Sequence, residues 1–223
     1  VKTMSGLKQK SVLRAPTGRA AKVLSNHAGQ QSFTIHKKIY RQDAFSNDLS
    51  AFHPSDNLHK DTLFIVDEAS MISNQGIDSH YFGSGRLLDD LIHYVYSGEN
   101  CRLMLMGDTA QLPPVMQVES PALQADILKG YNLQVDEIQL TEVVRQDLNS
   151  GILYNATLLR NSLQNNRMEI YPKLTVKGFA DIQMINGSEL IEAISNAYSK
   201  DGLDDTIVIS RSNKRANIYN NGI

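Results

Sequence analysis

Two stretches decide the fold: Leu63-Phe64-Ile65-Val66-Asp67-Glu68 and Leu103-Met104-Leu105-Met106-Gly107-Asp108. Each is a run of four apolar residues that leads into acidic residues, directly at Asp67-Glu68 and after Gly107 at Asp108. A short continuous apolar run is typical of a strand buried on both faces, as in a parallel sheet. Ligands of open α/β sheets bind at the carboxyl ends of the strands, where these carboxylates are expected. Adjacent carboxylates there can hold a hydrated Mg²⁺ and orient a water toward a phosphate, so the pattern favours nucleotide hydrolysis.

The other half of such a site, a phosphate-binding loop, does not occur in this sequence. Neither G-x-x-x-x-G-K-[ST] nor G-x-G-x-x-G is found in the 223 residues, and no lysine follows the cluster Gly83-Ser84-Gly85. The sequence also opens at Val1-Lys2-Thr3 without a methionine. We therefore expect a fragment that starts just downstream of a phosphate loop and that is inactive by itself.

Composition narrows the class of protein. Hydrophobic residues make up 41% of the chain, which is enough for a core. No apolar run approaches the roughly 20 residues of a membrane span, and the start shows no signal-peptide pattern. The single Cys101 forbids an intrachain disulfide, and the six histidines show no metal-ligand spacing. These features predict a cytoplasmic enzyme with no membrane association.

Charge is distributed unevenly along the chain. Residues 1–42 hold nine Lys and Arg and no Asp or Glu, whereas residues 43–223 hold 13 basic and 24 acidic residues. Such asymmetry favours a polyanionic partner near the amino-terminal third. The alternative is an ordinary solvated helix face.

The order of predicted elements indicates an α/β fold. Strands are expected at Ser11–Ala15, 62–66, 102–106, Ile138–Leu140, 181–185 and 206–210. Helices are expected at Gly18–His27, from the N-cap Thr34, at Ser84–Ser97, from Ser120-Pro121 to Gly130, at 150–164, at Ser188–Tyr198 and at 212–220, with a loop or small hairpin at 41–60. Alternating strands and helices imply a mostly parallel sheet with right-handed crossovers.

Several short motifs, taken in order, resemble those of superfamily 1 helicases. Ala15-Pro16-Thr17-Gly18-Arg19-Ala20-Ala21 resembles motif Ia, and Thr34-Ile35-His36 resembles the short DNA-contacting element after it. Ile65-Val66-Asp67-Glu68-Ala69-Ser70-Met71 resembles motif II, and the stretch from Gly107 to Val115 resembles motif III. Leu140-Thr141-Glu142-Val143-Val144-Arg145-Gln146 resembles motif IV. Together they are similar to the RecD-like branch, which includes the alpha subunit of exodeoxyribonuclease V.

The resemblance implies a RecA-like P-loop NTPase fold that is truncated at its amino terminus. Residues 1–172 are expected to form an incomplete first motor domain and residues 173–223 the start of a second one. The implied activity is ATP-dependent movement on single-stranded DNA in recombination or repair, with other recombination or nuclease subunits as further partners. Two alternatives stay open at this point: a P-loop ATPase that does not unwind DNA, and a non-catalytic scaffold.

The resemblance also assigns roles to residues. Asp67 is expected to hold Mg²⁺ through water and Glu68 to polarise the attacking water, with Gln111 and Arg145 acting on the γ-phosphate of ATP. Gly107 and Asp108 complete the predicted nucleotide site. The residues expected to contact DNA are Pro16, Thr17, Gly18, Arg19, Thr34 and His36. For His36 the alternative is an ordinary structural histidine, and for Arg145 it is a surface salt bridge.

Overall fold

The computed structural model of the chain describes residues 6, 8–42, 52–76, 82–140, 149–164 and 172–222. Contacts divide the chain into two compact units, Val1–Leu140 and Thr141–Ile223. The domain boundary predicted between residues 172 and 173 falls inside the second unit and stays a prediction.

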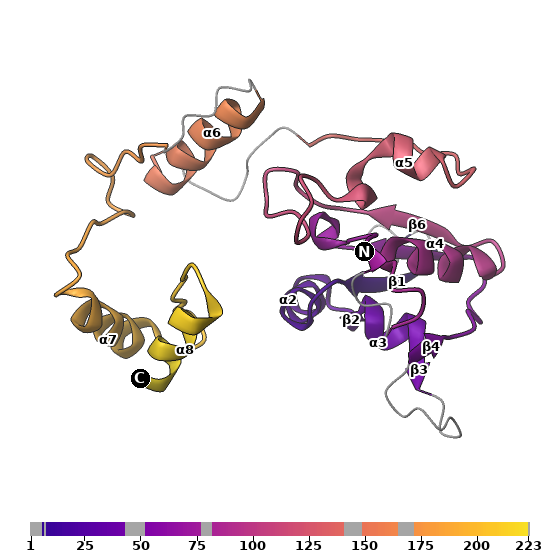
Figure 1. Cartoon of the computed structure of the whole chain (residues 1–223), viewed down its shortest axis with the longest axis horizontal. Helices are drawn as coiled ribbons and strands as arrows, with labels where there is room; N and C mark the ends of the chain where they lie inside the picture. The colour runs from indigo at the N-terminus through magenta and orange to yellow at the C-terminus, as the bar shows by residue number, and fades with distance from the viewer. Residues whose placement is uncertain are drawn as a thin grey trace. The chain divides into compact units, whose positions relative to one another are not determined.

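The first unit is built on a parallel sheet with the strand order β2-β1-β5-β6 (Figure 1). These strands are β1 (Lys10–Ala15), β2 (Ser32–Thr34), β5 (Thr62–Val66) and β6 (Arg102–Leu105), and each neighbouring pair runs parallel. The α/β class with a mostly parallel sheet, predicted from the alternating pattern, is therefore confirmed.

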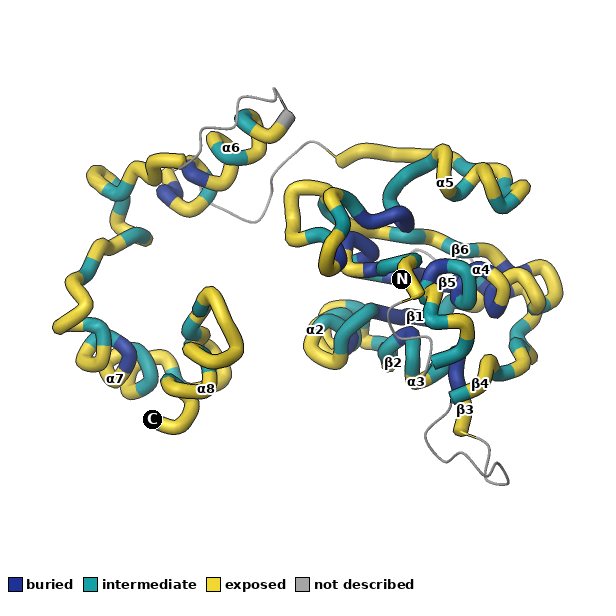
Figure 2. Tube along the Cα trace, in the orientation of Figure 1, coloured by how far each residue is buried: buried dark blue, intermediate teal, exposed yellow. Residues whose placement is uncertain are grey.

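Strand β5 lies inside the sheet because both of its edges are paired, to β1 on one side and to β6 on the other. Its residues Phe64, Ile65 and Val66 are at most 5% exposed. Burial on both faces explains why its sequence is a continuous apolar run rather than an alternating one. The buried residues of the first unit gather on this sheet and on the helices packed against it (Figure 2).

Helix α2 (Gly18–Ala28) follows β1 and ends where Gly29 adopts a left-handed φ of 63°. Helix α4 (Leu87–Ser97) precedes β6 and buries the stripe Leu88, Leu91, Ile92 and Val95 against the sheet. It begins three residues later than predicted. The Asp90 carboxylate accepts hydrogen bonds from both the backbone N–H and the hydroxyl of Ser84, which holds residues 84–86 in a turn before the helix.

Between β2 and β5 the chain forms helix α3 (Ile35–Ile39) and a small antiparallel hairpin. The hairpin pairs β3 (Tyr40–Gln42) with β4 (Phe52–Pro54), so the hairpin alternative for residues 41–60 is confirmed. Helix α3 contributes Ile35 and Ile39, which lie on one helix face, to the core.

The segment after β6 differs from prediction in two places. The single helix expected to begin at Pro121 is instead a 3-10 turn, η3 (Pro121–Leu123), followed by α5 (Ala125–Lys129). The extended backbone of Gln124, with φ −103° and ψ 107°, separates them. The predicted strand Ile138–Leu140 is wrong, because the segment pairs with no strand among the described residues and its two apolar end residues are 87% and 90% exposed.

The second unit contains α6 (Gly151–Gln164), α7 (Leu190–Asp201) and α8 (Asn213–Gly222). The helices predicted at 150–164, Ser188–Tyr198 and 212–220 are confirmed to within a few residues. The strands predicted at 181–185 and 206–210 are wrong: within the described part of this unit neither segment has a partner strand. None of the helices described in either unit is long and apolar enough to span a membrane.

One carboxylate fastens α6 to the chain that follows it. Asp181 accepts the Ser150 hydroxyl at 2.6 Å and the N–H groups of Gly151 and Ile152 at 2.9 and 3.2 Å. These hydrogen bonds lower the pKa of the Asp181 carboxyl, because they stabilise its charged form. Asn155 in the same helix also exchanges two hydrogen bonds with the backbone of Thr175.

Candidate functional site

Four turns meet at the carboxyl edge of the parallel sheet, in the order of the strands that they follow. The register pairs Ala15 with Thr34, Arg14 with Val66, and Val66 with Leu105, so these strands end side by side. The turns that follow them are therefore neighbours at one edge. In strand order they contain Thr34–His36, Pro16–Arg19, Asp67-Glu68 and Gly107–Gln111. The predicted DNA contacts thus follow β2 and β1, and the predicted nucleotide contacts follow β5 and β6.

Backbone hydrogen bonds join the β5 and β6 turns directly. The N–H of Met106 donates to Val66 O at 2.8 Å, and the N–H of Ala69 donates to Met106 O at 2.8 Å. On the other side, the N–H of Asp67 donates to Arg14 O at 3.0 Å. The position of Asp67 is therefore set by ladder hydrogen bonds and not by its own side chain.

The two carboxylates of the β5 turn have different environments. Asp67 is half-buried, and its Oδ1 accepts the N–H of Glu68 at 3.0 Å. Glu68 has a left-handed backbone, with φ 56° and ψ 38°, a conformation that costs a non-glycine residue roughly 1–2 kcal/mol. Such local strain is concentrated at functional sites, where the surrounding structure enforces it.

The surrounding structure here includes a serine from far along the chain. Ser120 is 2% exposed, and its Oγ lies 2.8 Å from Ala69 O and 2.7 Å from Ile72 O. These carbonyls flank the 3-10 turn η1 (Ala69–Met71), which follows Glu68 directly. The same Oγ accepts the N–H of Ala122, so the N-cap role predicted for Ser120 is confirmed. Its second role, fastening the turn after Glu68, has no signal in the local sequence.

The β6 turn approaches the β5 turn closely at Gly107. A Cβ built on Gly107 lies 2.8 Å from the backbone N of Ser70 and 3.0 Å from a methyl group of Leu123. No larger residue fits there without displacing backbone. Asp108 then forms a tight turn, because its Oδ1 accepts the N–H of Ala110 and its carbonyl accepts the N–H of Gln111, both at 3.0 Å.

Gln111 is exposed at the end of this turn. The structure thus brings four predicted nucleotide-site residues onto two adjoining turns. They are Asp67, Glu68, Asp108 and Gln111, with Gly107 at the closest approach. Arg145, the fifth predicted side chain of this site, lies outside the described residues.

The predicted magnesium role fits the donors that are present. Oδ1 of Asp67 is engaged by a backbone N–H, and the carboxylate has a second oxygen for a metal-bound water. Mg²⁺ usually keeps several waters and takes few protein ligands, so a lone carboxylate here matches its chemistry. The described residues contain no cluster of three or more potential metal ligands.

The turn after β1 presents a helix start. Thr17 caps α2, with its Oγ1 accepting the N–H of Ala20 at 3.2 Å, and the hydroxyl proton of Thr17 can still be donated. Arg19 is exposed in the first turn, which contains no acidic residue. The arrangement leaves a positive helix end and an exposed cation together, which suits a phosphodiester.

The neighbouring turn after β2 is more constrained than the sequence suggested. Thr34 caps α3 through the N–H of Lys37 at 3.2 Å, as predicted. The ring of His36 lies 5.1 Å from that of Phe82 and 5.7 Å from that of Tyr40. His36 is therefore part of an aromatic cluster, in agreement with the structural alternative weighed for it. Burial and a 2.7 Å hydrogen bond from Tyr40 to Asp90 raise the pKa of Tyr40 above its usual range.

The basic residues of the amino-terminal region are not all on the surface. Arg19, Lys22 and Lys37 are exposed, as a polyanion partner requires. Arg14 is only 5% exposed and lies inside the sheet layer. The charge count of residues 1–42 therefore overstates the positive surface that a partner can reach.

Comparisons with known proteins agree with this arrangement. A protein family described as an AAA domain matches residues 2–173. The ATP-dependent RecD2 DNA helicase of Deinococcus radiodurans is 32% identical over 145 residues, which cover 65% of this chain and 17% of that protein. The chain thus spans about one sixth of the length of that relative.

Proposed function

The chain belongs to the AAA domain family, and on that premise we propose that it is part of an ATP-dependent, RecD-like DNA helicase that moves along single-stranded DNA. The observation that carries the proposal is the order of the four turns at the carboxyl edge of the sheet. Acidic turns after β5 and β6 adjoin a cationic helix start after β1. A nucleotide and a polyanion can therefore contact adjacent turns of one rigid sheet.

On the nucleotide side, Asp67 would hold Mg²⁺ through water, and Glu68 receives the proton of the water that attacks the γ-phosphate. Mg²⁺ would supply charge neutralisation to the phosphates when bound. Gln111 is exposed at the end of the Asp108 turn, and its proposed role is to sense the loss of the γ-phosphate. Arg145 stabilises the charge that develops on the transferring group.

Coupling between the two ligands follows from the backbone connections. Asp67 is hydrogen-bonded to Arg14 O, one residue before Ala15, and Ala15 leads into the Pro16–Arg19 turn. A movement of the β5 turn on hydrolysis could therefore pass through this one hydrogen bond to β1, whose following turn is proposed to hold DNA. This short path supports a motor rather than a plain ATPase.

The DNA half of the proposal is testable on this chain. Replacing Arg19 with glutamine removes an exposed charge from the first turn of α2, whereas Lys22→Gln removes the same charge one turn later in that helix. We expect Arg19→Gln to weaken binding of a labelled single strand several-fold for all sequences alike and to lower the salt slope by about 1, as for one lost phosphate contact. Lys22→Gln is expected to have less than half of that effect. Fluorescence anisotropy at two salt concentrations measures both.

Equal effects of the two substitutions, or none, would move the DNA site away from the start of α2. The ATPase half is tested separately by phosphate release. Because no phosphate loop occurs in the 223 residues, we expect this chain to show no DNA-stimulated turnover by itself. A longer form of the protein that includes such a loop should turn ATP over, and its failure to do so would favour the scaffold alternative.

A further inference from the structure

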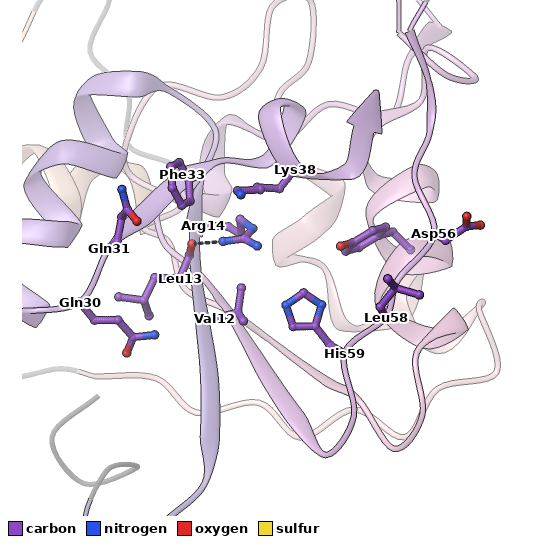
Figure 3. A pocket seen from close by; sticks show the side chains of 11 residues that line it. Val12, Leu13, Arg14, Gln30, Gln31, Phe33, Lys38, Asp56, Leu58 and His59 are labelled. Carbon is purple, nitrogen blue, oxygen red and sulfur yellow. Dashed lines mark hydrogen bonds between the residues drawn. The ribbon is translucent and has the colours of Figure 1, made fainter. Parts of the chain in front are cut away.

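A cavity of about 500 Å³ opens beside β1, on the face of the sheet that carries Val12, Arg14 and Phe33 (Figure 3). Its walls come from β1, from residues 30–38, from residues 56–59 and from Tyr94 of α4. Cavities of this size commonly hold small molecules. None of the residues assigned to nucleotide or DNA above lines it.

The floor of the cavity contains a buried arginine without a counter-ion. Arg14 is 5% exposed, its Nη1 donates to Leu13 O at 2.7 Å, and its Nε has no hydrogen-bond partner. No carboxylate among the described residues forms an ion pair with it. Burial lowers the pKa of Arg14 to about 10, which still leaves the group charged at neutral pH. Burying an unpaired charge is costly, so a structure that retains one requires a partner for it.

A second cation lies next to this arginine. The Nζ of Lys38 is 4.2 Å from the ring centroid of Phe33, whose face orients the ammonium group without neutralising it. The one acidic residue in the lining is Asp56, which pairs with Arg41 at 3.8 Å and has a side chain that is 81% exposed. In Figure 3 the Asp56 carboxylate points away from Arg14 and Lys38.

A neutral histidine lies on the same wall of the cavity. The Nδ1 of His59 lies 2.9 Å from Asn57 Oδ1, and Asn57 Nδ2 donates to two backbone carbonyls of α4, which fixes the orientation of this amide. Nδ1 therefore carries the proton of the neutral ring, and Nε2 is the atom that can gain one. Burial lowers the pKa of His59, and the charges of Arg14 and Lys38 lower it further.

We propose that this cavity binds a small-molecule oxyanion, a phosphate or carboxylate group, through Arg14 and Lys38. A guanidinium group fits the oxygens of either anion in a forked geometry, and the ammonium group adds a second charge. The anion would supply the acceptors that the buried guanidinium lacks. It would also favour protonation of His59, so binding is expected to take up protons.

The test measures anion binding by the whole 223-residue chain with two probes, inorganic phosphate and acetate, at constant ionic strength set with sodium chloride. Calorimetric titration gives the affinity, and titration in two buffers of different ionisation enthalpy gives proton uptake. Lys38→Met removes the lysine cation of the cavity and leaves Arg14 in place. Lys37→Met is the matched control, because Lys37 also lies over Phe33, at 5.2 Å, but does not line the cavity.

We expect saturable binding of at least one anion, weakened about tenfold or more by Lys38→Met and less than twofold by Lys37→Met. Arg14→Met should abolish binding and keep or raise the unfolding temperature in anion-free buffer, since it removes an unpaired buried charge. If that variant does not fold, the two lysine variants decide the question. No saturable binding of either probe, or equal losses in the two lysine variants, would overturn the proposal.

Discussion

Replacing Ser120 with alanine tests whether a distant serine holds the turn that carries Glu68. The substitution removes one Oγ atom from a site that is 2% exposed, and no water can replace it without a rearrangement. Ala69 O keeps a second hydrogen bond, from the N–H of Ile72 at 3.1 Å, but Ile72 O loses the one partner found for it among the described residues.

The magnitude follows from these losses. A stranded buried carbonyl costs roughly 1–2 kcal/mol, and the lost cap on Ala122 costs about 1 kcal/mol. The free energy of unfolding of the first unit should therefore fall by about 2–3 kcal/mol. Urea denaturation followed by circular dichroism measures this change, with an unchanged denaturant slope as the sign that the unfolded state is unaffected.

Ser97→Ala is the matched control. Its hydroxyl also donates to one backbone carbonyl, Tyr94 O at 2.9 Å, but Ser97 is exposed at the end of α4. Water can satisfy that carbonyl, so we expect a change within about 0.5 kcal/mol. If Ser120→Ala costs no more than Ser97→Ala, the serine does not fasten the turn and the argument from burial is refuted.

Three further outcomes are expected. In a form of the protein that includes a phosphate loop, Glu68→Gln should nearly abolish kcat while leaving ATP affinity within a few-fold; turnover near wild type in a steady-state assay excludes Glu68 as the proton acceptor. Gly107→Ala should destabilise the first unit by at least about 1 kcal/mol in urea denaturation, because its Cβ meets the backbone N of Ser70 at 2.8 Å; an unchanged midpoint means that the turns separate freely. Asp181→Asn should flatten the acid dependence of helix content in the second unit, since the folded pKa of Asp181 is lowered: its contribution is present above the unfolded pKa and is lost as the pH falls through the folded pKa. Parallel acid titrations of wild type and variant by circular dichroism would contradict this last assignment.

The elements that were predicted correctly have local sequence patterns that match their structure. Strand β5 was predicted correctly because its burial leaves a continuous apolar run, and β1 and α4 because their patterns match the structure that they adopt. Strand β6 carries a similar apolar run although none of its four residues is buried. The three segments wrongly predicted as strands also contain closely spaced apolar residues. Ile209 and Met184 in two of them are 87% and 78% exposed, so the apolar residues of those segments bury little surface. A strand exists only where another strand completes its hydrogen bonds, and the local pattern does not record whether one does.

The sequence by itself determined the class of fold, the two acidic turns and the caps at Thr34 and Ser120, because each depends on residues that are close along the chain. Only the tertiary structure decided which turns meet at one edge, since strand order depends on pairing between distant segments. It alone also placed Arg14 in a cavity rather than on a basic surface, and Ser120 beneath the turn after Glu68. Burial and long-range hydrogen bonds are properties of the packed chain, and they convert residues that look ordinary in the sequence into parts of a site.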